Sequence, residues 1–222
     1  MSVVIAVDGT AASGKGTLAK QLARHFGFAH MDSGALYRLA ALAVLSAGGD
    51  PANPDDALKG ARSIDLAMAG DPKIRTDKVG HAASKVAAIP EVRHALHQFQ
   101  SDFLAHPPGG SPGAVMDGRD IGTVICPNAS AKLFVDAAPE IRARRRLLEL
   151  KGLGIERDEA GLLAELNARD AADRARPVSP LKQAPDALLL DTSQLDIERA
   201  FKAALALVQS RVEDALKVRH RG

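Results

Sequence analysis

A glycine-rich segment containing one lysine directly follows the first apolar run of this chain. The run is Val3-Val4-Ile5-Ala6-Val7, and the segment reads Gly9-Thr10-Ala11-Ala12-Ser13-Gly14-Lys15-Gly16-Thr17. Glycines let a backbone wrap around phosphate oxygens, the N–H groups and the dipole of a following helix attract negative charge, and a lysine adds a point charge. Such a segment needs a strand before it and a helix after it. The sequence therefore predicts an α/β protein with a phosphate-binding loop, or P-loop.

The P-loop differs from the strict pattern at one position. That pattern has Ser or Thr directly after the lysine, whereas here Gly16 separates Lys15 from the hydroxyl of Thr17. We expect Thr17 to be a ligand of Mg²⁺. The alternative is a glycine-rich turn that binds nothing, and the position of the lysine after a strand favours phosphate binding over it.

Short apolar runs alternate with segments of helical period along most of the chain. Strands are predicted at residues 3–7, 28–31, 114–116, 132–135 and 187–190, and helices at 15–26, 34–46, 139–151 and 197–218. Asp196 is predicted to cap the last of these helices. This alternation is typical of a parallel sheet covered on both faces, here with roughly five strands.

Two stretches interrupt the alternation. From about residue 55 to 104 the pattern is helical without an apolar strand, which predicts an inserted helical subdomain. From about residue 152 to 176 the chain is polar and rich in arginine, which predicts a mobile helical lid. The remaining segments, 1–54, 105–151 and 177–222, are expected to form the core of a single domain.

Composition excludes several classes of protein. The chain has 222 residues, which at about 100 to 200 residues per domain suggests one core with appended subdomains. Its 29 Lys and Arg against 27 Asp and Glu leave a net charge of +2, too small to imply nucleic-acid binding. Cys126 is the only cysteine, so a reducing compartment, the cytoplasm, is expected. Without a leader pattern or a run of about 18 apolar residues, we expect no export and no membrane partner.

An acid and several arginines are candidates for phosphate chemistry. Asp117 ends the strand at 114–116, where a P-loop protein places an acid that holds the metal through water, although a turn-forming role is equally consistent with its position. Arginines gather in two segments: Arg142, Arg144, Arg145 and Arg146 after the strand at 132–135, and Arg157, Arg169, Arg174 and Arg176 in the predicted lid. Fixed guanidinium groups neutralise a moving phosphoryl group, and the alternative is ordinary solvated helix charge.

Three blocks of sequence resemble the bacterial cytidylate kinase family, which belongs to the P-loop nucleoside monophosphate (NMP) kinases. They are the P-loop, then Asp32-Ser33-Gly34-Ala35-Leu36-Tyr37-Arg38, then Asp117-Gly118-Arg119-Asp120-Ile121-Gly122-Thr123-Val124. Further similarity extends to the end of the chain. The resemblance implies a three-layer P-loop kinase core with a helical NMP-binding insertion and an arginine-rich lid. It also implies transfer of phosphate from ATP to CMP or dCMP with Mg²⁺ as cofactor. The protein is expected to be a monomer.

The resemblance further implies roles for individual residues. Gly9 to Thr17 would bind ATP. Residues that would contact the CMP phosphate are Arg38 and Arg119, and those that would recognise cytosine are Ser84, Arg93 and Asp120. Four residues would surround the ribose and the transferring phosphate, namely Ser33, Arg169, Asp173 and Arg176. Arg145 and Arg146 would close over the phosphates from the lid side. Catalysis would thus depend on Lys15, Arg119, Arg145, Arg146 and Arg169.

The choice of base follows from chemistry. Cytosine offers an amino donor at N4 and acceptors at N3 and O2, which a carboxylate and an arginine complement, as Asp120 and Arg93 would. Uracil would leave a buried carboxylate facing an oxygen, so UMP should be a poor substrate.

Two other functions stay open at this point. One is a P-loop NTPase switch whose arginines bind a macromolecule such as RNA, and steep salt dependence of that binding would favour it. The other is a P-loop kinase for a different small acceptor, such as shikimate or another nucleoside monophosphate.

Overall fold

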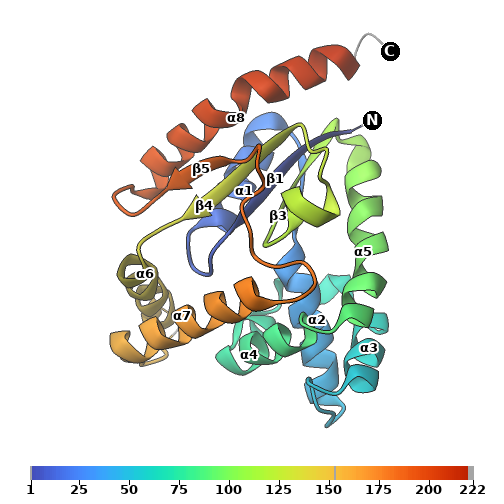
Figure 1. Ribbon diagram of the computed structural model, residues 1–222, viewed down its shortest axis with the longest axis vertical. Helices are drawn as coiled ribbons and strands as arrows, with labels where there is room; N and C mark the ends of the chain where they lie inside the picture. Colours follow the sequence, from blue (N-terminus) through green and yellow to red (C-terminus); the bar gives the residue numbers. More distant parts are fainter. Residues whose placement is uncertain (1, 153, 220–222) are drawn as a thin grey trace. The chain divides into compact units, whose positions relative to one another are not determined.

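A five-stranded parallel sheet forms the centre of the fold in the computed structural model, which describes residues 2–152 and 154–219 (Figure 1). The strands are β1 (Val3–Gly9), β2 (Ala29–Asp32), β3 (Gly113–Gly118), β4 (Ala131–Asp136) and β5 (Leu188–Asp191), in the order β2-β3-β1-β4-β5. β1 pairs in parallel with both β3 and β4. The carboxyl ends of these three strands therefore meet at one edge of the sheet, where α/β proteins bind ligands.

The central strands are buried because they are almost wholly apolar. All seven residues of β1 are buried. One face of the sheet packs against α1 (Lys15–Phe26) and α8 (Ile197–Arg219), through Val3, Ile5 and Val7 of the strand and a stripe of apolar residues along each helix. Figure 1 shows α8 running beside β4 and β5. The alternation of apolar strands and amphipathic helices in the sequence thus leads directly to a sheet covered by helices.

The chain divides into two compact units, one up to Met31 and from Leu104 onward, the other Asp32–Phe103. The second unit is helical. Its elements are α2 (Ser33–Ser46), α3 (Pro54–Arg62), the short 3₁₀ helices η1 (Leu66–Gly70) and η2 (Pro72–Arg75), α4 (Asp77–Val86) and most of α5 (Pro90–Ala105). Side chains of Asp32, Asn53 and Thr76 cap α2, α3 and α4, which satisfies amide groups that a helix start leaves unpaired.

Two further helices belong to the first unit, α6 (Pro139–Gly152) and α7 (Glu159–Ala175). They pack on one another and on Ala11 of the P-loop through Ala143, Leu150 and Leu162. Asp158 caps α7 by accepting a hydrogen bond from Gly161 N–H at 2.8 Å. Two short turns complete the unit, the 3₁₀ turn η3 (Pro108–Gly110) and the π-helical turn η4 (Ile121–Ile125).

The predicted α/β fold with a parallel sheet is confirmed, and all five strands lie within two residues of their expected bounds. The cap at Asp196 is confirmed by its hydrogen bond from Arg199 N–H at 2.8 Å. The stretch expected to be helical between the second and third strands is helical. None of the helices that the structure describes combines the length and apolar composition needed to cross a membrane.

Candidate active site

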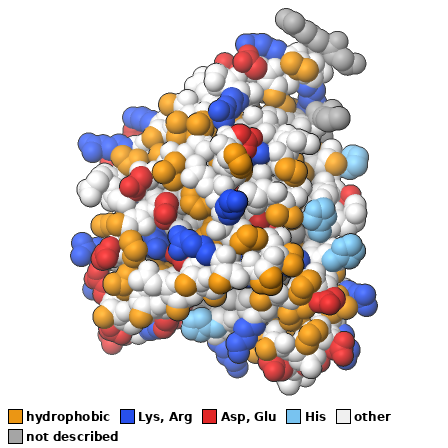
Figure 2. Space-filling view, viewed as in Figure 1, with side chains coloured by type: hydrophobic (Ala, Val, Ile, Leu, Met, Phe, Trp, Pro, Cys, Tyr) orange, Lys and Arg blue, Asp and Glu red, His pale blue; other side chains and the backbone are white. Residues whose placement is uncertain are grey.

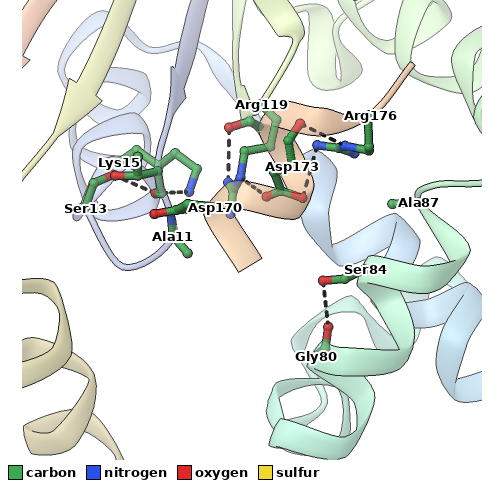
Figure 3. Close-up of polar contacts among 12 residues, drawn as sticks. Ala11, Ser13, Lys15, Gly80, Ser84, Ala87, Arg119, Asp170, Asp173 and Arg176 are labelled. Carbon is green, nitrogen blue, oxygen red and sulfur yellow. Dashed lines mark hydrogen bonds and ion pairs between the residues drawn. The ribbon is translucent and has the colours of Figure 1, made fainter. Parts of the chain in front are cut away.

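The P-loop leaves the carboxyl end of β1 and leads into α1. Gly9 has a φ of +153°, and a Cβ atom there would stand 2.0 Å from the carbonyl oxygen of Val135 on β4, so only glycine fits. Gly14 has a φ of +89° and precedes the first turn of α1. Within the loop, Ser13 Oγ donates to Thr10 O at 3.0 Å and Lys15 Nζ donates to the same oxygen at 3.2 Å. The ammonium group therefore lies over the loop (Figure 3).

Two carboxylates outside the loop hold it in place. Asp136, at the end of β4, accepts a hydrogen bond from Thr10 Oγ1 at 2.6 Å. Asp170 on α7 accepts one from Ala11 N–H at 3.0 Å and forms an ion pair with Arg142 of α6. Arg142 in turn donates to Ala11 O at 3.0 Å. Both partners of this ion pair are buried, with relative exposures of 1% for Asp170 and 3% for Arg142.

Asp173 on α7 lies between two arginines (Figure 3). Its Oδ2 accepts a hydrogen bond from Arg119 Nε at 2.9 Å, and its Oδ1 lies 3.2 Å from Arg176 Nη2. Burial alone would raise the pKa of the Asp173 carboxyl, but Arg119, Arg176 and Arg169 outweigh it, so that the pKa lies below its ordinary value. Burial alone would lower the pKa of Arg119, but Asp173, Asp170 and Asp117 outweigh it, so that the pKa lies above its ordinary value. This guanidinium therefore stays charged. The cluster is thus preorganised to meet an anion.

Asp117 is buried at the end of β3, beside the start of α1. Its Oδ1 lies 2.9 Å from His30 Nε2 on β2, and its Oδ2 would be 3.4 Å from a Cβ atom on Gly16. The neighbouring residue Thr17 is exposed. Carboxylate and hydroxyl oxygens are the hard ligands that Mg²⁺ prefers, so these residues fit a magnesium ion beside the P-loop.

Arg145 and Arg146, expected to close over phosphates, lie on α6. Arg145 donates to Thr192 Oγ1 at 2.9 Å and to the carbonyl oxygens of Thr192 at 2.7 Å and Leu195 at 3.2 Å. Partial burial lowers the pKa of this arginine from its ordinary value. Its Nη1 would be 4.0 Å from a Cβ atom on Gly14, so Arg145 flanks the P-loop. Arg146 forms an ion pair with Glu149 at 3.0 Å one turn along the same helix.

The remaining predicted residues of the first unit are Asp120 and Arg169. Asp120 is buried, with a relative exposure of 5%, and its carbonyl oxygen accepts hydrogen bonds from the N–H groups of Val124 and Ile125 in η4. Arg169 is half-buried on α7, four residues before Asp173, and lowers the pKa of that carboxyl. Residues 169, 173 and 176 have the spacing of one helix face, and the charge contact between Arg169 and Asp173 agrees with that spacing.

In the second unit, Arg38 on α2 and Ser84 on α4 both lie close to Gly80 of α4. Arg38 Nη1 donates to Ile74 O at 2.7 Å, and its guanidinium would lie 3.4 Å from a Cβ atom on Gly80. Ser84 Oγ donates to the carbonyl oxygen of that same Gly80 at 3.3 Å (Figure 3). The lack of a side chain at Gly80 therefore leaves room for the guanidinium of Arg38 beside α4.

Arg93 and Ser33 are the other predicted residues of this unit, and both are buried. Arg93 Nη1 donates to Ala87 O at 3.1 Å, and its guanidinium lies 5.3 Å above the ring of Tyr37. This is the geometry of a cation–π contact. Ser33 begins α2, directly after Asp32, which caps that helix.

Comparison with known proteins assigns the chain to a family. The family model described as cytidylate kinase matches residues 5–210. The chain belongs to the cytidylate kinase family. It is 54% identical to a cytidylate kinase of Nitrobacter winogradskyi, over 94% of this chain and 96% of the relative. It is 52% identical to one from Rhodospirillum rubrum, over 93% of this chain and 97% of the relative. The cytidylate kinases are phosphotransferases, and this chain is an enzyme of that class.

Two solved structures resemble the fold of this cytidylate kinase family member. An uncharacterized protein from Eubacterium ventriosum aligns with a TM-score of 0.53 at 14% identity, covering 94% of this chain and 99% of that chain. A gluconokinase from Sinorhizobium meliloti aligns with a TM-score of 0.50 at 15% identity, covering 96% and 95%. At such identities the similarity concerns the fold alone.

Three residues that the sequence analysis did not single out contribute to this site: Asp8, His30 and Asp170. Arg142 was named there only as one of the clustered arginines. Asp8 precedes Gly9 and is buried, and His30 contacts Asp117. The available signals were weak. Asp8 is a charged residue inside an otherwise apolar strand, and Asp170 stands next to Arg169 in a charged helix.

Proposed function

We propose that this protein transfers the γ-phosphoryl group of ATP to CMP or dCMP, which yields ADP and CDP or dCDP. Membership of the cytidylate kinase family is the observation that carries the proposal. The P-loop geometry and the cluster of Arg119, Asp173 and Arg176 support it, because a kinase needs a donor phosphate site and fixed positive charge near the transferred group.

Lys15 and the P-loop amides are proposed to hold the β- and γ-phosphates of ATP. Thr17, and Asp117 through a water molecule, are proposed to hold Mg²⁺, which when bound would neutralise charge on the phosphate oxygens. An oxygen of the CMP phosphate attacks the γ-phosphorus in line, and the bond from that phosphorus to the bridging oxygen breaks to release ADP. No covalent intermediate with the protein is needed, because positioning and electrostatics account for most of the catalysis in such enzymes.

Acceptor recognition is proposed for both units. In the first, Arg119 binds the CMP phosphate, Asp120 accepts from the cytosine amino group, and Arg169, Asp173 and Arg176 bind the ribose and the transferring phosphate. In the second, Arg38 binds phosphate, Ser84 and Arg93 recognise the base, and Ser33 binds the ribose. The insertion at about 55–104 and the lid at about 152–176 are proposed to close on binding, so that water is excluded and idle hydrolysis of ATP is slow.

Small-molecule substrates are also favoured by the distribution of charge. On the face drawn in Figure 2, Lys and Arg side chains lie interspersed with Asp and Glu instead of forming one basic patch. Nucleic-acid binders gather their basic residues on one face or along one helix.

The decisive experiment is a coupled assay of ADP release with Mg·ATP and either CMP, dCMP, UMP, AMP or no acceptor. Strong stimulation by CMP and dCMP alone is expected. Equal ADP release without any acceptor would favour the NTPase switch, and failure of every monophosphate to stimulate would point to another acceptor. The Asp120→Ala variant tests base recognition: it should lose CMP use and gain little toward UMP, whereas unchanged CMP turnover would exclude Asp120 from that role.

A further inference from the structure

A buried carboxylate at the end of β1 binds two consecutive backbone amides of a distant segment. Asp8 Oδ1 accepts a hydrogen bond from Ile121 N–H at 2.8 Å, and Asp8 Oδ2 accepts one from Gly122 N–H at 2.8 Å. The relative exposure of Asp8 is 4%, and the bonds span 113 and 114 residues of sequence. Both oxygens are therefore engaged, each by one amide.

The two amides belong to the turn that follows β3. β3 ends at Gly118, Arg119 and Asp120 come next, and Ile121 and Gly122 begin η4. The residue pair held by Asp8 is thus directly C-terminal to the pair proposed to bind the acceptor phosphate and base. Shifting the amides by even a fraction of an ångström would shift the carboxylate of Asp120 and the guanidinium of Arg119, because one short stretch of backbone carries all four residues.

We propose that Asp8 is a positioning residue for acceptor recognition, whose two oxygens fix the turn that presents Arg119 and Asp120 to the nucleoside monophosphate. This inference rests on the proposed function for the identity of the acceptor. It concerns a residue of the strand before the P-loop, so the same strand that leads to the ATP site also sets the geometry of the CMP site.

The chemistry of the site explains why a carboxylate is needed. Two parallel N–H donors require two acceptor atoms, and only a carboxylate offers both, since an asparagine amide replaces one acceptor with a donor. Burial raises the pKa of Asp8 to about 7, although the bonds from Gly122 and Ile121 oppose this rise. Of the neighbouring charges, Asp120 raises this pKa and Arg119 lowers it.

A lysine of β4 faces the same turn. The Lys132 side chain would be 3.0 Å from a Cβ atom on Gly122, at the same position where Asp8 Oδ2 would be 3.4 Å away. The ammonium group of Lys132 is engaged elsewhere, by Pro127 O at 2.5 Å and by Asp186 at 2.9 Å. Asp8 therefore receives no direct ion pair from Lys132, and its main partners are the two amides.

Steady-state kinetics of Asp8→Asn test the proposal. One of the two hydrogen bonds is replaced by two opposed donors, so the KM for CMP should rise about tenfold, in line with the loss of one buried hydrogen bond. The KM for ATP should change much less. A proportional rise of both KM values, or no rise in the KM for CMP, would overturn the proposal.

Asp136→Asn is the matched control, with the same substitution at the end of the neighbouring strand β4. Asp136 uses Oδ1 alone to accept from Thr10 Oγ1 at 2.6 Å and from Ala137 N–H at 2.8 Å, so an amide oxygen can keep both bonds. Because Thr10 belongs to the P-loop, any effect of this variant should fall on the KM for ATP. An equal effect of the two variants on the KM for CMP would contradict a specific role of Asp8.

A second measurement does not depend on catalysis. In a pH titration followed by ¹⁵N NMR, the amide signals of Ile121 and Gly122 should shift with an apparent pKa near 7 in the native protein and should not do so in Asp8→Asn. Amide signals that stayed insensitive from about pH 3 to about pH 9, the whole range over which a carboxyl group could lose its proton, would show that the carboxylate does not bind the turn, and would overturn the proposal. If native protein failed to phosphorylate CMP while these amides titrated, the proposed function would fail and the Asp8 contact would stand.

Discussion

The carboxylate of Asp170 joins helix α7 to the P-loop, because it accepts a hydrogen bond from Ala11 N–H at 3.0 Å and forms an ion pair with Arg142. Arg142 completes a ring of contacts by donating to Ala11 O at 3.0 Å. Asp173, one turn further along α7, holds Arg119. One helix thus contacts both the phosphate-binding loop and the arginine cluster, so its position is coupled to both.

Asp170→Asn should destabilise the protein by about 3 kcal/mol, since it leaves the Arg142 guanidinium buried without a counter-charge. Urea unfolding measures the change. The control is Glu165→Gln on the same helix, which removes the partner of Arg157 at a more exposed position and should cost less than about 1 kcal/mol. Equal costs for the two variants would mean that burial of the Asp170 pair has no special consequence.

Arg119→Lys should lower kcat/KM for CMP about thirtyfold, equivalent to about 2 kcal/mol, which is typical of a hydrogen bond to a charged group. Lysine keeps the charge but cannot reproduce the Nε bond to Asp173 at 2.9 Å and still present donors to a phosphate. Arg174→Lys, at an exposed position next to Asp173 on α7, is the control and should be nearly neutral. Steady-state kinetics at saturating ATP distinguish the two, and an unchanged kcat/KM in Arg119→Lys would contradict the proposed role of Arg119 in binding the CMP phosphate.

Lys15→Met should reduce kcat by about 10² to 10³, the range found when one preorganised donor to a developing charge is removed. The Lys15 side chain is half-buried and donates to the neutral carbonyl oxygen of Thr10, and urea unfolding measures whether the substitution also changes stability. Lys20→Met, exposed on the same helix α1, is the matched control and should retain full activity. A large loss of stability in Lys15→Met would instead indicate a structural role for this lysine.

Local patterns predicted the sheet and the P-loop. Val3 to Val7 is an unbroken apolar run, and the loop after it contains glycines at positions whose backbone conformation requires them, such as Gly9 with a φ of +153°. Each feature lies within a segment of about ten residues, so hydrophobic periodicity and turn residues suffice to predict it.

Contacts that span the sequence were not predictable in the same way. Asp170 lies 159 residues from Ala11, and helical spacing says only which face of α7 it occupies. Arg142 was one of several arginines predicted either to meet phosphate or to be solvated, yet it is 3% exposed and pairs with Asp170. Arg145 contacts the segment Thr192 to Leu195, whose proximity to α6 depends on strand order that no local pattern encodes.

Asp8 should make the stability of the native protein depend on pH in a way that Asp8→Asn does not. Burial raises the pKa of this carboxyl from 3.8 to about 7 in the folded state. Between these values the folded protein holds a proton on Asp8 that the unfolded chain has lost. The stabilisation that this proton gives is therefore full below about pH 4 and is lost as the pH rises through 7. The free energy of unfolding of native protein, relative to the variant, should therefore fall by roughly 4 kcal/mol over this interval.

Urea titrations of both proteins between pH 4 and pH 8 measure this difference, and titrating groups far from Asp8 cancel in the comparison because both proteins share them. If the difference in free energy of unfolding between native protein and Asp8→Asn stayed constant, or grew in favour of the native protein with rising pH, burial would not raise the pKa of Asp8 in the folded state. Suppose that this free-energy difference falls with pH as expected and that the KM for CMP rises in the variant. Burial of Asp8 would then lower stability at neutral pH, while its two hydrogen bonds serve acceptor recognition. Desolvated groups at functional sites commonly show this combination.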